Sequence, residues 1–281
     1  RRKTSMISSN NNILKGENGR TILLDYQYQE TDHPLPVVVF CHGYKGFKDW
    51  GAWSLMGSAF AKAGFLFIKF NYSHNGGTVE EPIDFPDLDA FSKNNYSIEV
   101  RETKIVLDWI ESADLPVDKT KINLIGHSRA GGITTIVTAN DHRVSKLITL
   151  AGVADYAQRF PSGKALEEWK EKGVMHVKNG RTKQDMPHLY QFFEDFKHNE
   201  EALTILRQAQ KIKQLHLILH GDNDEAVHVN DAHKLHEASP NSQLKLIRDA
   251  NHVFGASHPW HQDRLPEDLR QSVQCMVNFL R

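Results

Sequence analysis

The chain has 281 residues, of which 40% are hydrophobic and 25% charged, as expected for one large globular domain with a substantial core. Its 34 lysines and arginines nearly balance its 35 aspartates and glutamates, and the resulting formal charge of -1 argues against binding to nucleic acid or anionic membranes through overall charge. No apolar run approaches the roughly 20 residues that span a bilayer, so we expect no membrane span.

The N-terminal segment RRKTSMISSNNNILKG is basic, but no apolar stretch follows its charges. This pattern argues against an intact signal peptide and favours the cytoplasm, with a signal peptide that has already been removed as the alternative. Cys41 lies in an apolar run and Cys275 in a helical pattern, so we expect two buried thiols rather than a disulfide framework. The oligomeric state is left open.

Seven apolar segments rich in β-branched or aromatic residues predict strands, and helical spacing predicts helices between most of them. The alternation indicates an α/β fold: a mostly parallel central sheet, entered through an antiparallel edge pair, with helices on both faces. The predicted strands are 21–29, 35–43, 65–73, 121–128, 144–153, 215–221 and 243–250, and the predicted helices are 50–64, 96–112, 130–141, 229–239 and 266–281.

Residues 155–212 interrupt this alternation, because they contain helical segments and a hairpin pattern around Asn179 and Gly180 but no strong core strand. An excursion of this length is typical of an inserted cap rather than of a structureless loop. We therefore expect a core of residues 18–154 and 213–281 with an inserted cap or lid at 155–212. The alternative is an additional packed helical layer.

The segment INLIGHSRAGG, residues 122–132, places Ser128 where a predicted strand turns sharply into a predicted helix. A nucleophile at such a turn needs small neighbours two residues before and two after it, and Gly126 and Ala130 meet this requirement. The usual pattern has glycine where Ala130 stands. Taken alone, the motif is also compatible with a serine that caps a helix.

The segment HGYKG, residues 42–46, follows an earlier predicted strand. Acyl transfer needs N–H donors aimed at the oxyanion, and this loop and the residue after the nucleophile can supply them. We therefore nominate the backbone N–H groups of Tyr44 and Arg129. Without the serine motif, an ordinary tight turn would be the preferred interpretation of this segment.

A nucleophilic serine also needs a base and an acid that orients the base. Asp222 and Asp224 follow the predicted strand 215–221, and His252 follows the predicted strand 243–250. The chain order of serine, acid and histidine, each after a different strand, is the order expected for this type of site.

Together these segments resemble the α/β-hydrolase superfamily from about residue 18 to the C-terminus. The resemblance implies Asp224 rather than Asp222 as the acid, because it lies three residues after the glycine of the acid loop, and His252 rather than His258 or His261 as the base. The layout is similar to that of bacterial small-lidded carboxylesterases of the cinnamoyl and feruloyl esterase type. The motifs that carry the resemblance are HGYKG, GHSRAG, HGDNDEAV and NHVFG.

The resemblance implies a serine esterase that acts on a small or aromatic acyl ester through an acyl-enzyme, with no metal or organic cofactor. Ser128 would attack, His252 would transfer the proton, and Asp224 would orient the imidazole. A peptidase or amidase and a thioesterase are alternatives with the same residues. A binding protein that has lost catalysis is a further alternative, since fold alone does not determine function.

Several other residues have weaker interpretations. We expect the acidic segment 79–91 to be a solvated loop, and Lys45 and Lys48 to be surface lysines, with attraction of an acidic substrate group as the alternative for the two lysines. We assign the Arg129 side chain no chemistry. Aromatic residues of the insert are expected either to line a pocket or to anchor the insert. They are Trp169, Tyr190, Phe192 and Phe193.

Overall fold

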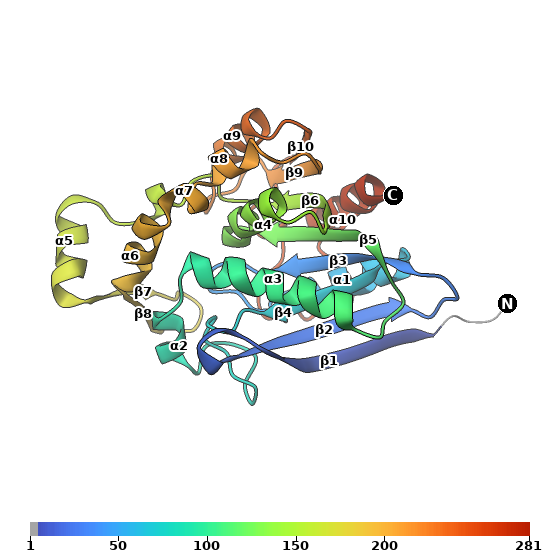
Figure 1. Cartoon of the computed structure of the whole chain (residues 1–281), viewed down its shortest axis with the longest axis horizontal. Helices are drawn as coiled ribbons and strands as arrows, with labels where there is room; N and C mark the ends of the chain where they lie inside the picture. The colour runs from blue at the N-terminus through green and yellow to red at the C-terminus, as the bar shows by residue number, and fades with distance from the viewer. Residues whose placement is uncertain (1–4) are drawn as a thin grey trace.

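A computed structural model describes residues 5–281 and is built on an eight-stranded sheet (Figure 1). All neighbouring strands run parallel except two antiparallel pairs at one edge, β1 with β2 and β2 with β4. In spatial order the strands are β1 (Met6–Lys15), β2 (Thr21–Gln29), β4 (Leu66–Asn71), β3 (Leu35–Cys41), β5 (Val117–His127), β6 (Val144–Leu150), β9 (Leu215–Gly221) and β10 (Ser242–Ile247).

Helices cover both faces of the sheet, as the sequence predicts. Alternate residues of β3 belong to different cores: Val37 and Val39 pack on one face, and Val38 and Phe40 on the other. This is expected for a parallel strand that is buried on both sides. One face carries α3 (Tyr96–Ser112), α4 (Arg129–Asn140), α8 (Ile205–Ala209) and α9 (Asn230–Ala238), and the other carries α1 (Trp53–Lys62) and α10 (Glu267–Leu280).

Three elements before residue 93 were not predicted. Strand β1 lies before residue 18, where we expected the core to begin, and it pairs with β2 through a bulge between Ser9 and Asn12. The short helix α2 (Leu88–Ser92) replaces the end of the expected loop, and the Asp87 side chain caps it by accepting from the Ala90 N–H. Glu17–Gly19 forms a single turn of 3-10 helix between β1 and β2.

Most of the segment 155–212 extends beyond the carboxyl ends of the parallel strands, at the left of Figure 1, whereas its last helix, α8, packs on the face of the sheet beside α4 and α9. The hairpin expected around Asn179 is present as an antiparallel pair, β7 with β8. The elements of this segment are a 3-10 turn (Ala157–Arg159), α5 (Gly163–Lys172), β7 (Val174–Lys178), β8 (Asp185–Leu189), α6 (Gln191–His198), α7 (Glu200–Leu203) and α8.

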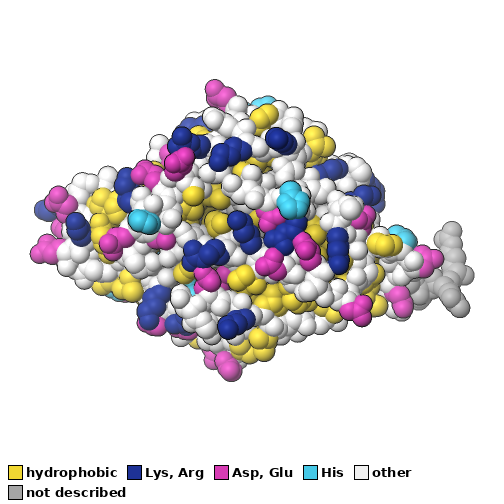
Figure 2. Space-filling view, viewed as in Figure 1, with side chains coloured by type: hydrophobic (Ala, Val, Ile, Leu, Met, Phe, Trp, Pro, Cys, Tyr) yellow, Lys and Arg dark blue, Asp and Glu magenta, His cyan; other side chains and the backbone are white. Residues whose placement is uncertain are grey.

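Basic and acidic side chains are interspersed on the face of the molecule seen in Figure 2, in keeping with the formal charge of -1. Within residues 5–281, no helix combines the length and apolarity needed to cross a bilayer.

Candidate active site

Ser128 occupies a strained turn between β5 and α4, with φ of 58° and ψ of -118°. Residues other than glycine rarely adopt this region. The turn requires glycine at position 126, because a Cβ there would lie 2.2 Å from both the Ala130 carbonyl and the Thr134 hydroxyl and would clash with them. The Ser128 side chain makes no capping hydrogen bond to α4. The structure therefore does not support the interpretation of Ser128 as a helix cap.

A chain of hydrogen bonds joins Ser128, His252 and Asp224. The Ser128 Oγ lies 3.0 Å from the Nε2 of His252, and the Nδ1 of His252 lies 2.8 Å from the Oδ2 of Asp224. With Nδ1–H donating to the carboxylate, Nε2 is left to accept from the serine hydroxyl. The three residues follow β5, β9 and β10, whose carboxyl ends share one edge of the sheet.

The side chain of Asp224 is fully buried, and its Oδ1 accepts backbone N–H bonds from Ala226 and Val227. Although burial raises the pKa of this carboxyl, hydrogen bonds from His220 and His252 hold it well below its usual range. Asp224 therefore stays ionised and can orient the imidazole of His252.

The other acid and the two other histidines considered from the sequence lie elsewhere, and one of these, His261, is exposed. Asp222 accepts a hydrogen bond from the Asp249 N–H. The Nδ1 of His258 accepts from the Gly51 N–H at 2.8 Å. The structure thus brings Asp224 and His252, and none of the alternatives, to Ser128.

The loop after β3 touches the turn that carries Ser128. A Cβ built on Gly43 would lie 3.0 Å from the Ser128 Cβ and 3.6 Å from the Arg129 nitrogen, so glycine allows this close approach without crowding. Within residues 5–281, neither the Tyr44 N–H nor the Arg129 N–H donates to another protein group. Both nominated donors are therefore available beside the serine.

Residues 36–184, slightly more than half of the chain, match the family model described as the alpha/beta hydrolase fold. The chain belongs to the α/β-hydrolase family. Strands β4 to β6, all but the first residue of β3, and the strained turn at Ser128 lie within the matched residues.

Solved structures similar to this α/β-hydrolase share its fold at low sequence identity. Est1E from Butyrivibrio proteoclasticus with bound ferulic acid has a TM-score of 0.70 and 15% identity, covering 94% of this chain and 95% of its own. The esterase domain of a Rhodothermus marinus protein has a TM-score of 0.64 and 13% identity over 98% and 97% of the two chains. A protein from Agrobacterium vitis S4 has a TM-score of 0.71 and 19% identity over all of both chains.

A curated relative of this α/β-hydrolase is an uncharacterised 31.7 kDa protein from the traX-finO intergenic region of Escherichia coli. It is 25% identical over 134 residues, which are 48% of this chain and 43% of the relative. The match therefore spans less than half of that protein.

Two cavities of the α/β-hydrolase meet at the serine. The larger has a volume of about 580 Å³ and the smaller of about 200 Å³, and both are lined by Tyr44, Lys45, Ser128 and His252. The smaller one is also lined by Trp50 and Trp53. The segment 155–212 supplies part of the wall of the larger cavity, through residues that include Gln158, Met175, Val177, His188 and Phe192.

The aromatic residues of the segment divide between the two roles that we expected. Phe192 lines the larger cavity. Trp169 is buried in the core and donates from its Nε1 to the His188 carbonyl at 2.9 Å, whereas Tyr190 and Phe193 pack against that core.

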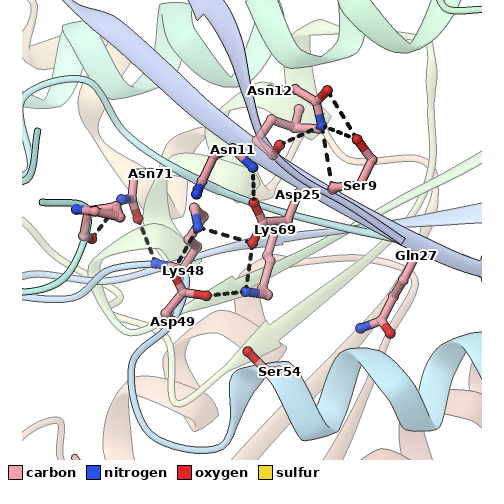
Figure 3. A network of polar contacts seen from close by, with 12 residues as sticks. Ser9, Asn11, Asn12, Asp25, Gln27, Lys48, Asp49, Ser54, Lys69 and Asn71 are labelled. Carbon is pink, nitrogen blue, oxygen red and sulfur yellow. Dashed lines mark hydrogen bonds and ion pairs between the residues drawn. The ribbon is translucent and has the colours of Figure 1, made fainter. Parts of the chain in front are cut away.

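Lys48 is not the surface residue that we expected: its side chain is only 2% exposed. Figure 3 shows its Nζ between Asp25 and Asp49, with Lys69 bound to the same two carboxylates. Asp25 also accepts the Asn11 N–H at the β1 bulge. The network therefore ties the loop beyond Tyr44 to the edge of the sheet.

Residues 5–281 contain no group of three or more histidine, cysteine, aspartate or glutamate side chains that could hold a metal ion. Cys41 is a buried free thiol, and Cys275 is free and partly buried.

Proposed function

We propose that this α/β-hydrolase is a serine carboxylesterase that cleaves small or aromatic acyl esters through an acyl-enzyme. The observation that carries the proposal is the hydrogen-bonded chain of Ser128, His252 and Asp224, with the Ser128 Oγ 3.0 Å from the imidazole. The distance is short enough for direct proton transfer between the two side chains.

In the first half of the reaction, Ser128 Oγ bonds to the carbonyl carbon while its proton passes to the Nε2 of His252. The tetrahedral intermediate then collapses, the bond to the alcohol oxygen breaks, and His252 returns the proton to the departing alcohol. In the second half, water attacks the acyl-enzyme, His252 again transfers the proton, and Ser128 is regenerated. One ester and one water give one carboxylic acid and one alcohol.

The negative charge of each tetrahedral intermediate would be stabilised by the backbone N–H groups of Tyr44 and Arg129. Both lie on segments that Gly43 allows to approach closely. Preorganised donors of this kind typically contribute 10²–10³ in turnover each. Asp224 would remain ionised throughout and stabilise the charged imidazole.

We propose that residues 155–212 act as a cap that shapes the acyl or alcohol site. Support comes from its residues in the larger cavity and from its bonds to the core. The Tyr44 hydroxyl pairs with the His188 Nε2 at 2.7 Å, and the Ser97 hydroxyl donates to Asp195 at 2.7 Å. A segment bonded in this way would define a pocket of fixed shape on the core.

The test is labelling by a fluorophosphonate probe, followed by turnover assays with matched short-chain esters, hydroxycinnamoyl esters, thioesters and aminoacyl amides. We expect the parent protein and the Ser112→Ala control, which changes an exposed hydroxyl, to label and to hydrolyse esters. Ser128→Ala should abolish labelling and lower turnover about ten-thousandfold or more.

Different results would lead to different conclusions. Faster turnover of amides or thioesters by the same serine would replace the esterase assignment with one of those activities. A parent protein that neither labels nor turns over any acyl substrate would overturn the proposal and leave a binding protein on this fold.

A further inference from the structure

The guanidinium of Arg129 is surrounded by aromatic rings in the larger cavity. Its Cζ lies 4.3 Å from the centroid of Tyr44, 5.1 Å from that of Tyr96 and 5.2 Å from that of Phe192. These are distances at which a cation is attracted to the face of a ring. The side chain belongs to the residue next to the candidate nucleophile, and so a group bound to it would lie close to the scissile bond.

This guanidinium has no polar partner. In the described part of the chain, no carboxylate lies within 4.0 Å of it and no acceptor takes a hydrogen bond from it. A guanidinium carries five N–H donors, and the Arg129 side chain is only partly buried, so its donors can be reached from the cavity. Ring faces satisfy the charge in part but accept no in-plane N–H bond, so the donors remain available to a ligand.

Glu99 is the acidic residue that approaches Arg129 from the protein side. Burial raises the pKa of this carboxyl to about 7, although attraction to Arg129 opposes the rise. At neutral pH Glu99 is therefore only partly ionised, and it forms no ion pair with Arg129 among the described residues. Arg129 therefore has no carboxylate in direct contact, although Glu99 and the neighbouring tyrosines favour its charged form and raise its pKa.

The larger cavity collects positive charge. Lys45 and Arg159 line it together with Arg129, and among the lining residues of the described chain there is neither an aspartate nor a glutamate. Elsewhere the signs are mixed, as on the face in Figure 2. A low-dielectric cavity with cations alone favours an anion.

We propose that the substrate of this site carries a free carboxylate, which Arg129 binds in the larger cavity while the uncharged part lies in the smaller cavity beside Trp50 and Trp53. This inference rests on the proposed hydrolytic function. The planar guanidinium matches a carboxylate through two parallel N–H bonds, and Lys45 adds a point charge nearby. The carboxylate is on either the acyl or the alcohol side of the ester, and the two positions are separable by experiment.

The experiment compares each charged ester with its neutral amide counterpart. For the acyl side, the pair is the mono-4-nitrophenyl ester of glutaric acid and the same ester with a terminal carboxamide. For the alcohol side, the pair is 3-acetoxybenzoate and 3-acetoxybenzamide. The measured quantity is the preference, defined as kcat/KM for the charged ester divided by kcat/KM for the neutral one. We expect a preference of at least about tenfold in one pair, because a hydrogen bond to a charged group contributes about that much or more.

Three variants identify the residue responsible. Arg129→Met keeps the backbone N–H and should reduce the preference about 10- to 100-fold, whereas Arg129→Lys keeps the charge and should retain part of it. Lys62→Met removes a cation from an exposed position of α1 and should leave the preference as in the parent protein. A preference near one in both pairs, or one that Arg129→Met does not change, would overturn the inference while the proposed hydrolysis stands.

Binding gives a readout that does not depend on turnover. In the Ser128→Ala variant, calorimetry should detect binding of glutarate or of 3-hydroxybenzoate. The corresponding neutral amides should bind to this variant at least tenfold more weakly. Once Arg129→Met is added, no carboxylate binding should be detected. If the parent protein shows neither labelling nor turnover, the proposed function fails. In that case this titration still decides whether Arg129 forms a carboxylate site.

Discussion

The Nε2 of His127 lies 3.0 Å from the backbone carbonyl of His252, so the residue before the candidate nucleophile holds the loop that carries the candidate base. Because the carbonyl can only accept, the Nε2 of His127 carries the proton. Burial lowers the pKa of His127 to about 3 and keeps its ring neutral. His127 is placed by β5 and packed edge-on against Trp53, and we expect it to act as a positioning residue.

Removing this hydrogen bond should impair turnover more than binding. We expect His127→Phe to lower kcat roughly 10- to 100-fold, with a smaller change in KM, because a shift of about 1 Å in a catalytic group can cost a hundredfold in rate. His127→Gln retains an N–H donor at a similar position and should recover much of kcat. Steady-state kinetics at a temperature well below unfolding measures both effects. Equal kcat in the two variants would contradict a positioning role.

The backbone strain at Ser128 should be measurable as stability. A non-glycine residue at φ of 58° and ψ of -118° costs about 1–3 kcal/mol, and glycine adopts such angles without a Cβ clash. Ser128→Gly should therefore raise the free energy of unfolding by roughly 1 kcal/mol over Ser128→Ala, while neither variant turns over an ester. Urea unfolding of the two inactive variants makes the comparison. Identical midpoints would mean that the turn stores no strain.

The sheet and the candidate triad could be predicted because their signals are local. Each parallel strand is a short apolar run, and such runs between helical patterns indicate an α/β fold. The serine, the acid and the histidine each follow the end of a predicted strand. Because these strands are parallel, their carboxyl ends lie at one edge of the sheet, and the three residues come together there. The predicted helix 96–112 has the bounds of α3, because Asn95 caps its start and its apolar spacing is regular.

Other features depended on partners that are distant in the chain. Strand β1 is polar and mostly exposed, so it has no apolar periodicity, and its pairing with β2 places it at the edge. The sequence around Lys48 predicts a surface lysine, because its partner Asp25 and the neighbouring Lys69 are distant in the chain and meet it only in the fold. The side chain of Arg129 acquires a role only when Tyr96 and Phe192 meet around it.

Acid should destabilise the fold partly through His216. This ring is completely buried between the hydroxyls of Thr149 and Ser239, and burial lowers its pKa from 6.5 to about 3. Protonation is therefore easier in the unfolded chain. The stability contributed by neutral His216 is fully present above about pH 6.5 and is lost as the pH falls toward 3, by up to about 1.4 kcal/mol per pH unit.

The variant His216→Gln removes this titration and should flatten the dependence of the unfolding free energy on pH between 6.5 and 4. His33→Gln, at an exposed position, is the matched control and should keep the slope of the parent protein. Denaturant unfolding at intervals of half a pH unit provides the slopes. A slope for His216→Gln equal to that of His33→Gln would refute the assignment.

The buried network of Asp25, Lys48, Asp49 and Lys69 should respond to charge balance more than to the number of its bonds. Removing one member of a buried pair leaves an uncompensated charge, so Lys69→Met should lower the free energy of unfolding by about 3–5 kcal/mol. Adding Asp25→Asn restores the charge neutrality of the network and leaves the Lys48 and Asp49 pair intact at 2.7 Å. The new amide also keeps an oxygen that can accept the Asn11 N–H at the β1 bulge. The double variant should therefore be more stable than Lys69→Met alone. Chemical denaturation of the single and double variants measures the difference. Lys15→Met, which removes an exposed lysine, is the control. A double variant less stable than Lys69→Met would mean that individual hydrogen bonds, and not charge balance, hold this loop in place.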